Sequence, residues 1–330
     1  MSARFHRALL FTAIVCPAAL FAQTQTLGQL LEQHRVPAAS FPADELSTPV
    51  SGVSQEDPAR LVIAYTRMHP DRSPFGRPYA LRFEKSTGAV EHRELQMSED
   101  DVCNSALEDL AFVDSFSIVS VHVSPDAGCL LVVDSKLLLR TILYGFDATR
   151  IAPNQIVLIE SMIHFSAAHP ERLQFADLTT GKTEELYPAK GDALRDKLIT
   201  LHEQRLPSQS TCAVFNDPCE PEVFDEDIGS VGTNGKGKLA FVATQEPAHR
   251  LKEGEPAVTV ASQTVLYVYE KRSDGWFYCE RELDKAAAEE LDKKLSSAFN
   301  DVASRCSPDL AVVPDMSTAQ FNPFFVLGKK

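Results

Sequence analysis

The sequence lacks the short signatures that mark the common catalytic and cofactor sites. It has no Gly-x-Ser-x-Gly segment, which argues against a serine hydrolase of the α/β type. It has no Cys-x-x-Cys or Cys-x-x-His pair, which argues against a structural zinc site. The glycine-rich segment 232–238 precedes a predicted strand instead of a helix, so we interpret it as a turn and not as a phosphate-binding loop. No cofactor is therefore predicted.

The sequence also lacks, after Gln23, any apolar run long enough to cross a bilayer, so no membrane span is predicted. Residues 1–22 have the features of an export signal. Arg4 and Arg7 precede a short apolar core, and the segment ends on the small side chain of Ala22. We expect cleavage near Ala22 and a protein that is periplasmic or secreted.

Basic residues are scarce relative to acidic ones. The chain has 32 Lys and Arg against 46 Asp and Glu, a formal net charge of −14. The predicted signal carries arginines but no acids, so its removal makes the protein more acidic still. This charge favours solubility and argues against nucleic acid or an anionic membrane surface as partners. The partner that we expect is a protein or a glycan of unknown identity.

Cysteine is present in a number that suits an oxidising compartment. Cys16 leaves with the predicted signal, and an even number remains, which in an exported protein indicates disulfides. The cysteines that remain are predicted to pair sequentially: Cys103 with Cys129, Cys212 with Cys219, and Cys279 with Cys306.

Alternating apolar residues dominate the middle of the chain. Val119, Val121 and Val123 alternate with polar residues, which predicts a half-buried strand, and two more apolar runs follow before residue 146. Strands separated by a polar loop and then by a glycine turn recur in the segments 61–95, 156–187 and 239–283. The recurrence predicts several small antiparallel sheets packed side by side.

Two turns carry a resemblance to a known family. The Ser-Pro-Asp turn at 124–126, and the pattern that joins Phe175, Asp177 and Gly181, resemble blade motifs of periplasmic, TolB-like β-propellers. The resemblance covers about half of the chain. It implies a mainly β fold of antiparallel sheets, propeller-like with few and irregular blades and a few peripheral helices. A β-sandwich, or two small α+β domains, would use the same strands and remains an alternative.

The predicted organisation has four parts. The signal at 1–22 is followed by an extended N-terminal segment at 23–54, a single β-rich domain at 55–306, and a C-terminal tail at 307–330 that docks on the body. Within the domain, helices are expected near 192–206 and 284–304, because leucine, alanine and phenylalanine side chains recur there at helical spacing. A short helix over 98–110, capped by Ser98, is a further interpretation.

Two segments hold candidate binding residues. The acidic stretch 216–227 could bind calcium through oxygen ligands, although its spacing is not that of an EF-hand and a solvated loop is the alternative. Its candidate ligands are Asp217, Glu220, Asp225 and Asp227. A long polar loop is locally basic and could meet an acidic peptide or glycan. Its candidate binding residues are Arg67, His69, Arg72 and Arg77.

These observations favour an exported, non-catalytic binding or scaffolding protein. The alternative is an extracytoplasmic hydrolase that acts on peptides or glycans, with carboxylates from separate strands. The two hypotheses differ in one structural expectation. Only the hydrolase requires two buried acids, with pKa values pushed apart, that face a pocket.

Overall fold

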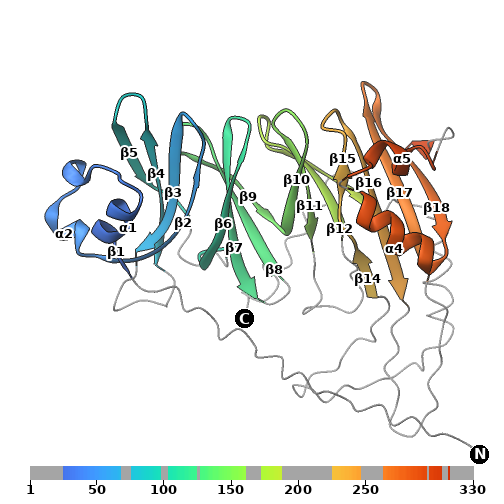
Figure 1. The fold of residues 1–330 in the computed structure, drawn as a ribbon, viewed down its shortest axis with the longest axis horizontal. Helices are drawn as coiled ribbons and strands as arrows, with labels where there is room; N and C mark the ends of the chain where they lie inside the picture. The colour runs from blue at the N-terminus through green and yellow to red at the C-terminus, as the bar shows by residue number, and fades with distance from the viewer. Residues whose placement is uncertain are drawn as a thin grey trace, which may run out of the picture.

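The computed structural model shows four antiparallel sheets that stand side by side in a row (Figure 1). It describes residues 25–67, 76–97, 103–124, 127–160, 172–187, 225–246, 263–295, 297–306 and 311–312. The prediction of a mainly β fold with antiparallel sheets and few helices is confirmed. The strands do not form the two layers of a β-sandwich. Instead, each sheet packs on the next one along the row.

Each sheet is a meander of strands that are neighbours in the sequence. The first contains β1 (Gln25–Thr26), β2 (Pro49–Glu56), β3 (Arg60–Arg67), β4 (Arg77–Glu84) and β5 (Ala89–Glu94). The second contains β6 (Ala106–Val113), β7 (Phe116–Ser124), β8 (Ala127–Val133) and β9 (Leu139–Tyr144). The third contains β10 (Phe146–Ala152), β11 (Gln155–Glu160), β12 (Arg172–Asp177) and β13 (Lys182–Tyr187). The fourth contains β14 (Asp225–Ile228), β15 (Gly232–Thr233), β16 (Lys238–Glu246), β17 (Gln263–Arg272), β18 (Gly275–Leu283) and β19 (Ala311–Val312).

Strands at or near the start of the first three meanders are among those that the sequence does not reveal. Most residues of β2, β6 and β10 are exposed or half-buried, so these strands lack an apolar pattern. The predicted helix over 98–110 is wrong where the structure describes it, because residues 106–113 form β6 and pair with β7. Backbone pairing to an apolar neighbour is what makes these polar segments strands.

Successive side chains of an inner strand are buried in two different cores, one on each face of the sheet. In β11, Ile156 and Leu158 face the second sheet, whereas Val157 and Ile159 face the fourth. Successive side chains of a strand point to opposite faces, so a strand between two sheets is apolar on both faces. The burial of all four side chains, each at most 3 % exposed, explains the continuous apolar run in this strand.

Helices cover the outer face of the first sheet. Helix α1 (Leu27–Gln33) packs Leu27, Leu30 and Leu31 against the outer side chains of β3 and β4. The short helices η1 (Ala38–Ser40) and α2 (Ala43–Leu46) follow. The predicted extended segment at 23–54 is therefore corrected over residues 25–54, which hold helices and the start of β2. The Thr26 capping box, in which Thr26 and Gln29 bond each other's backbone, starts α1.

Helices also cover the outer face of the last sheet (Figure 1). Helix α4 (Lys285–Lys294) begins after Asp284, whose side chain accepts a hydrogen bond from the backbone N–H of Ala287 as predicted. The predicted single helix over 284–304 is instead two, because the chain turns before α5 (Phe299–Ala303). Leu291, Leu295 and Phe299 pack on β16 and β17. No helix of the described residues is long and apolar enough to cross a membrane.

Two of the predicted disulfides are present. Cys103 is bonded to Cys129 of β8, and Cys279 of β18 is bonded to Cys306 just after α5. The break between α4 and α5 lets the chain return to the sheet, which a single helix would not allow. Cys212 and Cys219, the helix predicted near 192–206 and all of the tail except residues 311–312 lie outside the described residues.

Some of the turns that join the strands lie along one edge of the row, where polar groups link neighbouring sheets (Figure 1). Asp114, in the turn between β6 and β7, binds the guanidinium of Arg150 in the third sheet at 2.9 Å through each carboxylate oxygen. It also accepts a hydrogen bond from the backbone N–H of Asn154 at 2.7 Å. These bonds lower the pKa of Asp114, so it stays ionised and pairs the second sheet with the third.

Candidate functional site

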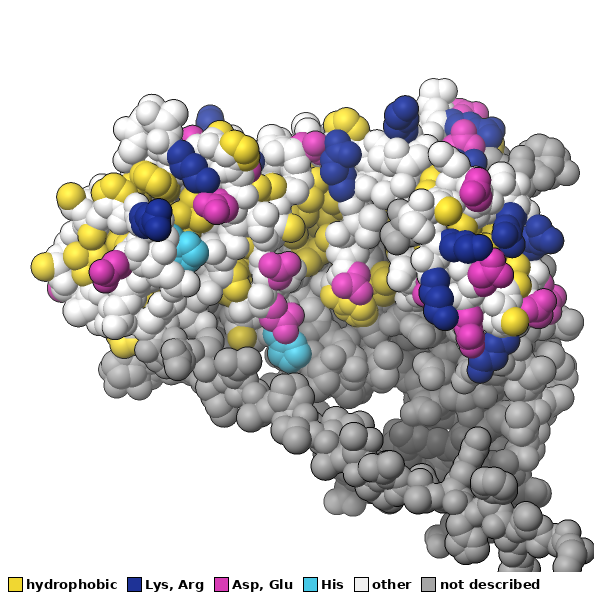
Figure 2. All heavy atoms as spheres, viewed as in Figure 1, with side chains coloured by type: hydrophobic (Ala, Val, Ile, Leu, Met, Phe, Trp, Pro, Cys, Tyr) yellow, Lys and Arg dark blue, Asp and Glu magenta, His cyan; other side chains and the backbone are white. Residues whose placement is uncertain are grey.

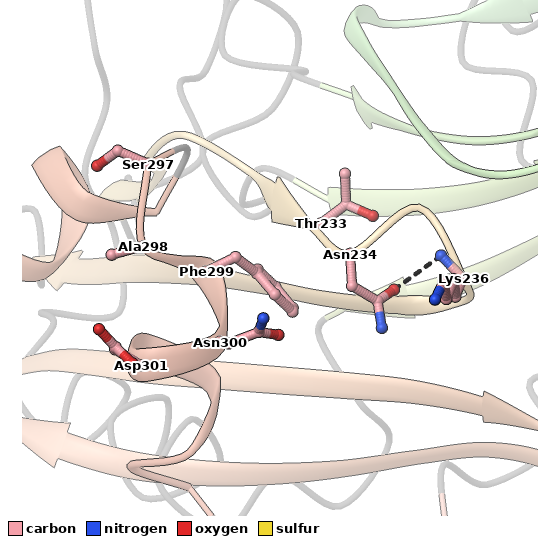
Figure 3. Close-up of a pocket in the computed structure, with 8 residues that line it drawn as sticks. All are labelled: Thr233, Asn234, Lys236, Ser297, Ala298, Phe299, Asn300 and Asp301. Atoms are coloured by element: carbon pink, nitrogen blue, oxygen red, sulfur yellow. Dashed lines mark hydrogen bonds between the residues drawn. The ribbon is translucent and has the colours of Figure 1, made fainter.

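A polar pocket of about 540 Å³ lies at the end of the row, between the turn that joins β15 to β16 and the corner between α4 and α5 (Figure 3). Ligand sites of small molecules have volumes of this order. The residues that line it are Thr233, Asn234, Lys236, Ser297, Ala298, Phe299, Asn300 and Asp301.

The first wall of the pocket is a tight turn held by the side chain of Asn234. Its Oδ1 accepts hydrogen bonds from the backbone N–H groups of Lys236 and Lys238, at 2.8 and 3.0 Å. Gly235 and Gly237 have φ values of 68° and 90°, a conformation that favours glycine. The prediction that segment 232–238 contains a turn is confirmed. The turn holds the carboxamide of Asn234 at the rim of the pocket.

The second wall is brought close by the absence of a side chain at Gly232. A Cβ atom there would lie 2.6 Å from the carbonyl oxygen of Leu295, so only glycine lets α4 end this near to β15. Phe299, which is 8 % exposed, anchors the start of α5 in the core under the helices. In Figure 3 its ring points toward Asn234, with Asn300 beside it.

Three polar side chains that line the pocket have no partner among the described residues. Lys236, Asn300 and Asp301 are exposed, and their side chains make no hydrogen bond or ion pair with the described residues. Charged groups elsewhere are commonly paired, as in Arg67 with Glu45 and Arg150 with Asp114. The pocket therefore collects an ammonium donor, a carboxylate acceptor and a carboxamide that can do both.

The predicted basic loop is only partly described, at its two ends. Arg67 and Arg77 are cross-strand partners in β3 and β4, whereas His69 and Arg72 lie outside the described residues. Arg67 Nη2 lies 2.7 Å from a carboxylate oxygen of Glu45, and its guanidinium stacks 4.1 Å from the ring centroid of Tyr79.

Arg77 is also paired with an acid. Its Nη1 atom lies 3.1 Å from Oε1 of Glu94, whose other carboxylate oxygen accepts a hydrogen bond from the hydroxyl of Tyr79 at 3.2 Å. Both described arginines therefore already have a carboxylate partner, Glu45 of α2 for Arg67 and Glu94 of β5 for Arg77. A role for this loop in binding stays a prediction.

The structure does not test the predicted calcium ligands as a set. Asp225 and Asp227 belong to β14, whose backbone pairs with β16, and Asp217 and Glu220 lie outside the described residues. No group of three or more His, Cys, Asp or Glu side chains in the described chain could hold a metal ion. The calcium site likewise stays a prediction.

A second site of interest surrounds Glu160 at the end of β11, which is 4 % exposed. By alternation its side chain is on the face of Ile156 and Leu158, toward the second sheet. Burial raises the pKa of Glu160 to about 6, against the attraction of Arg172, its cross-strand partner in β12. Gln174 donates a hydrogen bond of 2.6 Å from Nε2 to Oε2 of Glu160.

A second acid lies beside this group. Glu185 of β13 is the cross-strand partner of Gln174, and its Oε2 is 3.4 Å from Nη1 of Arg172. Its negative charge adds to the rise in the pKa of Glu160. Two acids, a base and an amide thus share one face of the third sheet.

Sequence reasoning missed both groups. Asn300 and Asp301 read as surface positions of a long helix, and nothing nearby in the sequence links them to the turn at Asn234. Glu160 carried a weak signal, because it is an acid directly after four apolar residues of a buried strand. A lone acid in such a position needs a partner or an unusual pKa.

Comparison with known proteins adds little. No family model and no curated protein matches the sequence. Among solved structures, an uncharacterized protein, lmo1340 from Listeria monocytogenes EGD-e, matches with a TM-score of 0.22 and 8 % identity, over 71 % of this chain and 59 % of that one. The β-propeller domain of the Trilobed protease from Pyrococcus furiosus matches with a TM-score of 0.24 and 9 % identity, over 68 % of this chain and 80 % of that one. Likenesses at these scores carry no argument about function.

Proposed function

We propose that the protein is an exported, non-catalytic binding or scaffolding protein, and that the pocket between the β15–β16 turn and α5 is a binding site for its ligand. The proposal includes the TolB-like blade arrangement that the turns at 124–126 and 175–181 suggested. The two disulfides support the compartment, because such bonds persist in oxidising environments outside the cytosol.

The observation that carries this proposal is that one concavity is lined by polar side chains that have no hydrogen-bond or ion-pair partner among the described residues. Lys236, Asn300 and Asp301 reach the pocket from two elements that are distant in the sequence. Polar groups that line a concave surface without internal partners can exchange their water for a ligand, and a rigid scaffold keeps the entropy cost of that exchange low. The turn at Asn234 and the buried ring of Phe299 supply that rigidity.

The same pocket is poorly suited to acid–base catalysis. Its ionisable residues are Lys236 and Asp301, and both are exposed. A general acid or base that works near neutral pH needs a pKa moved by burial or by a close charge. Binding is therefore the function that these side chains support best.

A direct test measures binding and turnover on the same preparation. The exported form of the chain is passed over arrays of immobilised oligosaccharides and peptides, and the compounds that bind are then incubated with it in solution and examined for cleavage by mass spectrometry. Retention of a compound that stays intact supports the proposal. Cleavage of the retained compound contradicts the non-catalytic part, and a failure to retain any compound of either class contradicts the binding part.

The hydrolase alternative has one specific observation in its favour. Glu160, with a pKa of about 6, could donate a proton near neutral pH, and Glu185 is a carboxylate on the same face. If this alternative holds, peptides or glycans are cleaved, and Glu160→Gln abolishes cleavage while the variant stays folded. Gln33→Ala, at an exposed position of α1 at the far end of the row, is the control. Cleavage that survives in Glu160→Gln excludes Glu160 as the acid.

A further inference from the structure

We propose that the pocket beside α5 binds a neutral carbohydrate, such as the end of a glycan chain. The inference rests on the proposed binding function and names its ligand class. Three properties of the pocket lead to it: the balance of hydrogen-bond donors and acceptors, the balance of charge, and the shape of the concavity.

The hydrogen-bonding groups of the lining suit the hydroxyls of a sugar. The ammonium of Lys236 only donates, the carboxylate of Asp301 only accepts, and the carboxamide of Asn300 does both. The NH₂ group of Asn234 adds a donor, because its Oδ1 is already occupied by the turn. Each sugar hydroxyl both donates and accepts, so it can be satisfied by such a mixed set, whereas a phosphate or carboxylate ligand would leave the acceptor Asp301 opposed to it.

The charge of the pocket points the same way. One cation and one anion line it, so its local charge is balanced on a chain whose net charge is −14. Figure 2 shows basic and acidic side chains interspersed over the end of the row where α4 and α5 lie, without a region of one sign. An acidic ligand would be repelled by the protein as a whole and gain no basic cluster in return.

The shape and the apolar part of the pocket favour a sugar over a peptide. Its apolar side chains are Ala298 and the largely buried Phe299, so a ligand in the pocket meets mainly polar groups (Figure 3). A peptide side chain would require a deeper apolar recess, and these are the two apolar side chains of the lining. A volume of about 540 Å³ accommodates a short oligosaccharide.

The experiment compares three sets of probes on the full exported chain: neutral trisaccharides of glucose, galactose, mannose and N-acetylglucosamine; the same trisaccharides ending in a uronic acid; and unstructured peptides of similar mass. Titration calorimetry measures each affinity for the unchanged protein and for Asn300→Ala and Asp301→Asn. Both substitutions are at exposed positions of α5, and circular dichroism checks that the variants are folded. Gln33→Ala is the matched control for loss of an amide.

The expected result is that at least one neutral trisaccharide binds, and that each α5 substitution weakens this binding by about tenfold, the factor for one lost hydrogen bond. Gln33→Ala should leave the affinity unchanged. Preference for acidic trisaccharides or for peptides overturns the inference and leaves the binding function standing. If a neutral trisaccharide binds with the same affinity to the unchanged protein and to Asn300→Ala and Asp301→Asn, the sugar binds elsewhere and the assignment to this pocket is wrong. If no probe of any set binds, the proposed function itself fails.

Discussion

Replacing Glu160 with glutamine should make the protein more stable at neutral pH and leave it unchanged in acid. The pKa of Glu160 rises from 4.5 to about 6 on folding, mainly through burial. At a pH below 4.5 the group is protonated in both the folded and the unfolded chain. As the pH rises through this interval, the unfolded chain releases its proton first, so the folded state loses stability until the pH passes about 6.

The size of this loss follows from the difference between the two pKa values. At about 1.4 kcal/mol for each pH unit, ionised Glu160 costs the folded state ~2 kcal/mol at neutral pH. Glutamine has nearly the same shape and never ionises, and its carbonyl oxygen can still accept the hydrogen bond from Gln174. Glu160→Gln should therefore raise the free energy of unfolding by ~2 kcal/mol at about pH 8 and by close to zero at about pH 4.

Urea unfolding, followed by the fluorescence of the single Trp276, measures this difference at both pH values for the unchanged chain and the variant. Other acids also titrate over this range, but they do so equally in both proteins and cancel in the comparison. Glu289→Gln is the control, because Glu289 is an exposed acid of α4, away from this face. The reasoning would be refuted if Glu160→Gln changed the free energy of unfolding by the same amount at both pH values.

Three further predictions concern packing, and urea unfolding measures each. Replacing both Cys279 and Cys306 with serine should lower the free energy of unfolding by about 3–4 kcal/mol, because the bond closes a loop with a sequence separation of 27. Leu291→Ala should cost about 2–5 kcal/mol, because this fully buried side chain holds α4 on the last sheet. Gly145→Ala should cost about 3 kcal/mol or prevent folding, because its Cβ atom would lie 2.4 Å from the carbonyl oxygen of Ile159.

Matched controls separate these causes. The serine pair should match the parent chain treated with a reductant when the remaining cysteines of both chains are replaced by serine. Ala286, an exposed residue of α4, can be changed to glycine to measure loss of helix propensity without loss of packing. Gly88→Ala introduces a side chain at a positive φ of 71° where nothing lies within 4 Å. An equal effect at Gly88 and Gly145 would show that close packing of the sheets is not the cause.

The sequence predicts the apolar part of this fold and misses the polar part. β3, β7 and β16 were evident because buried, β-branched side chains mark them. β6 and β10 were not, because their place in a sheet depends on pairing with a neighbour instead of on their own side chains. The break between α4 and α5 was missed for a related reason: the helical spacing of apolar residues continues across it.

The candidate sites were less predictable still. The turn at Asn234 was recognisable because asparagine and glycine favour it locally. Its approach to Asn300 was not, because it depends on a long-range contact between Gly232 and the carbonyl of Leu295. The basic loop shows the opposite failure: Arg67 and Arg77 stand out as charges in the sequence, but the carboxylates that pair with them lie on other elements.

The helices that cover the two outermost sheets make the row modular. Every internal sheet has an apolar face toward each neighbour, whereas an outermost sheet has one apolar face toward its neighbour and one beneath helices. The number of sheets is thus not set by ring closure, and a duplicated internal meander could be added without altering either terminus of the stack. A chain of this design can lengthen during evolution one meander at a time and keep the same covering helices at its two ends.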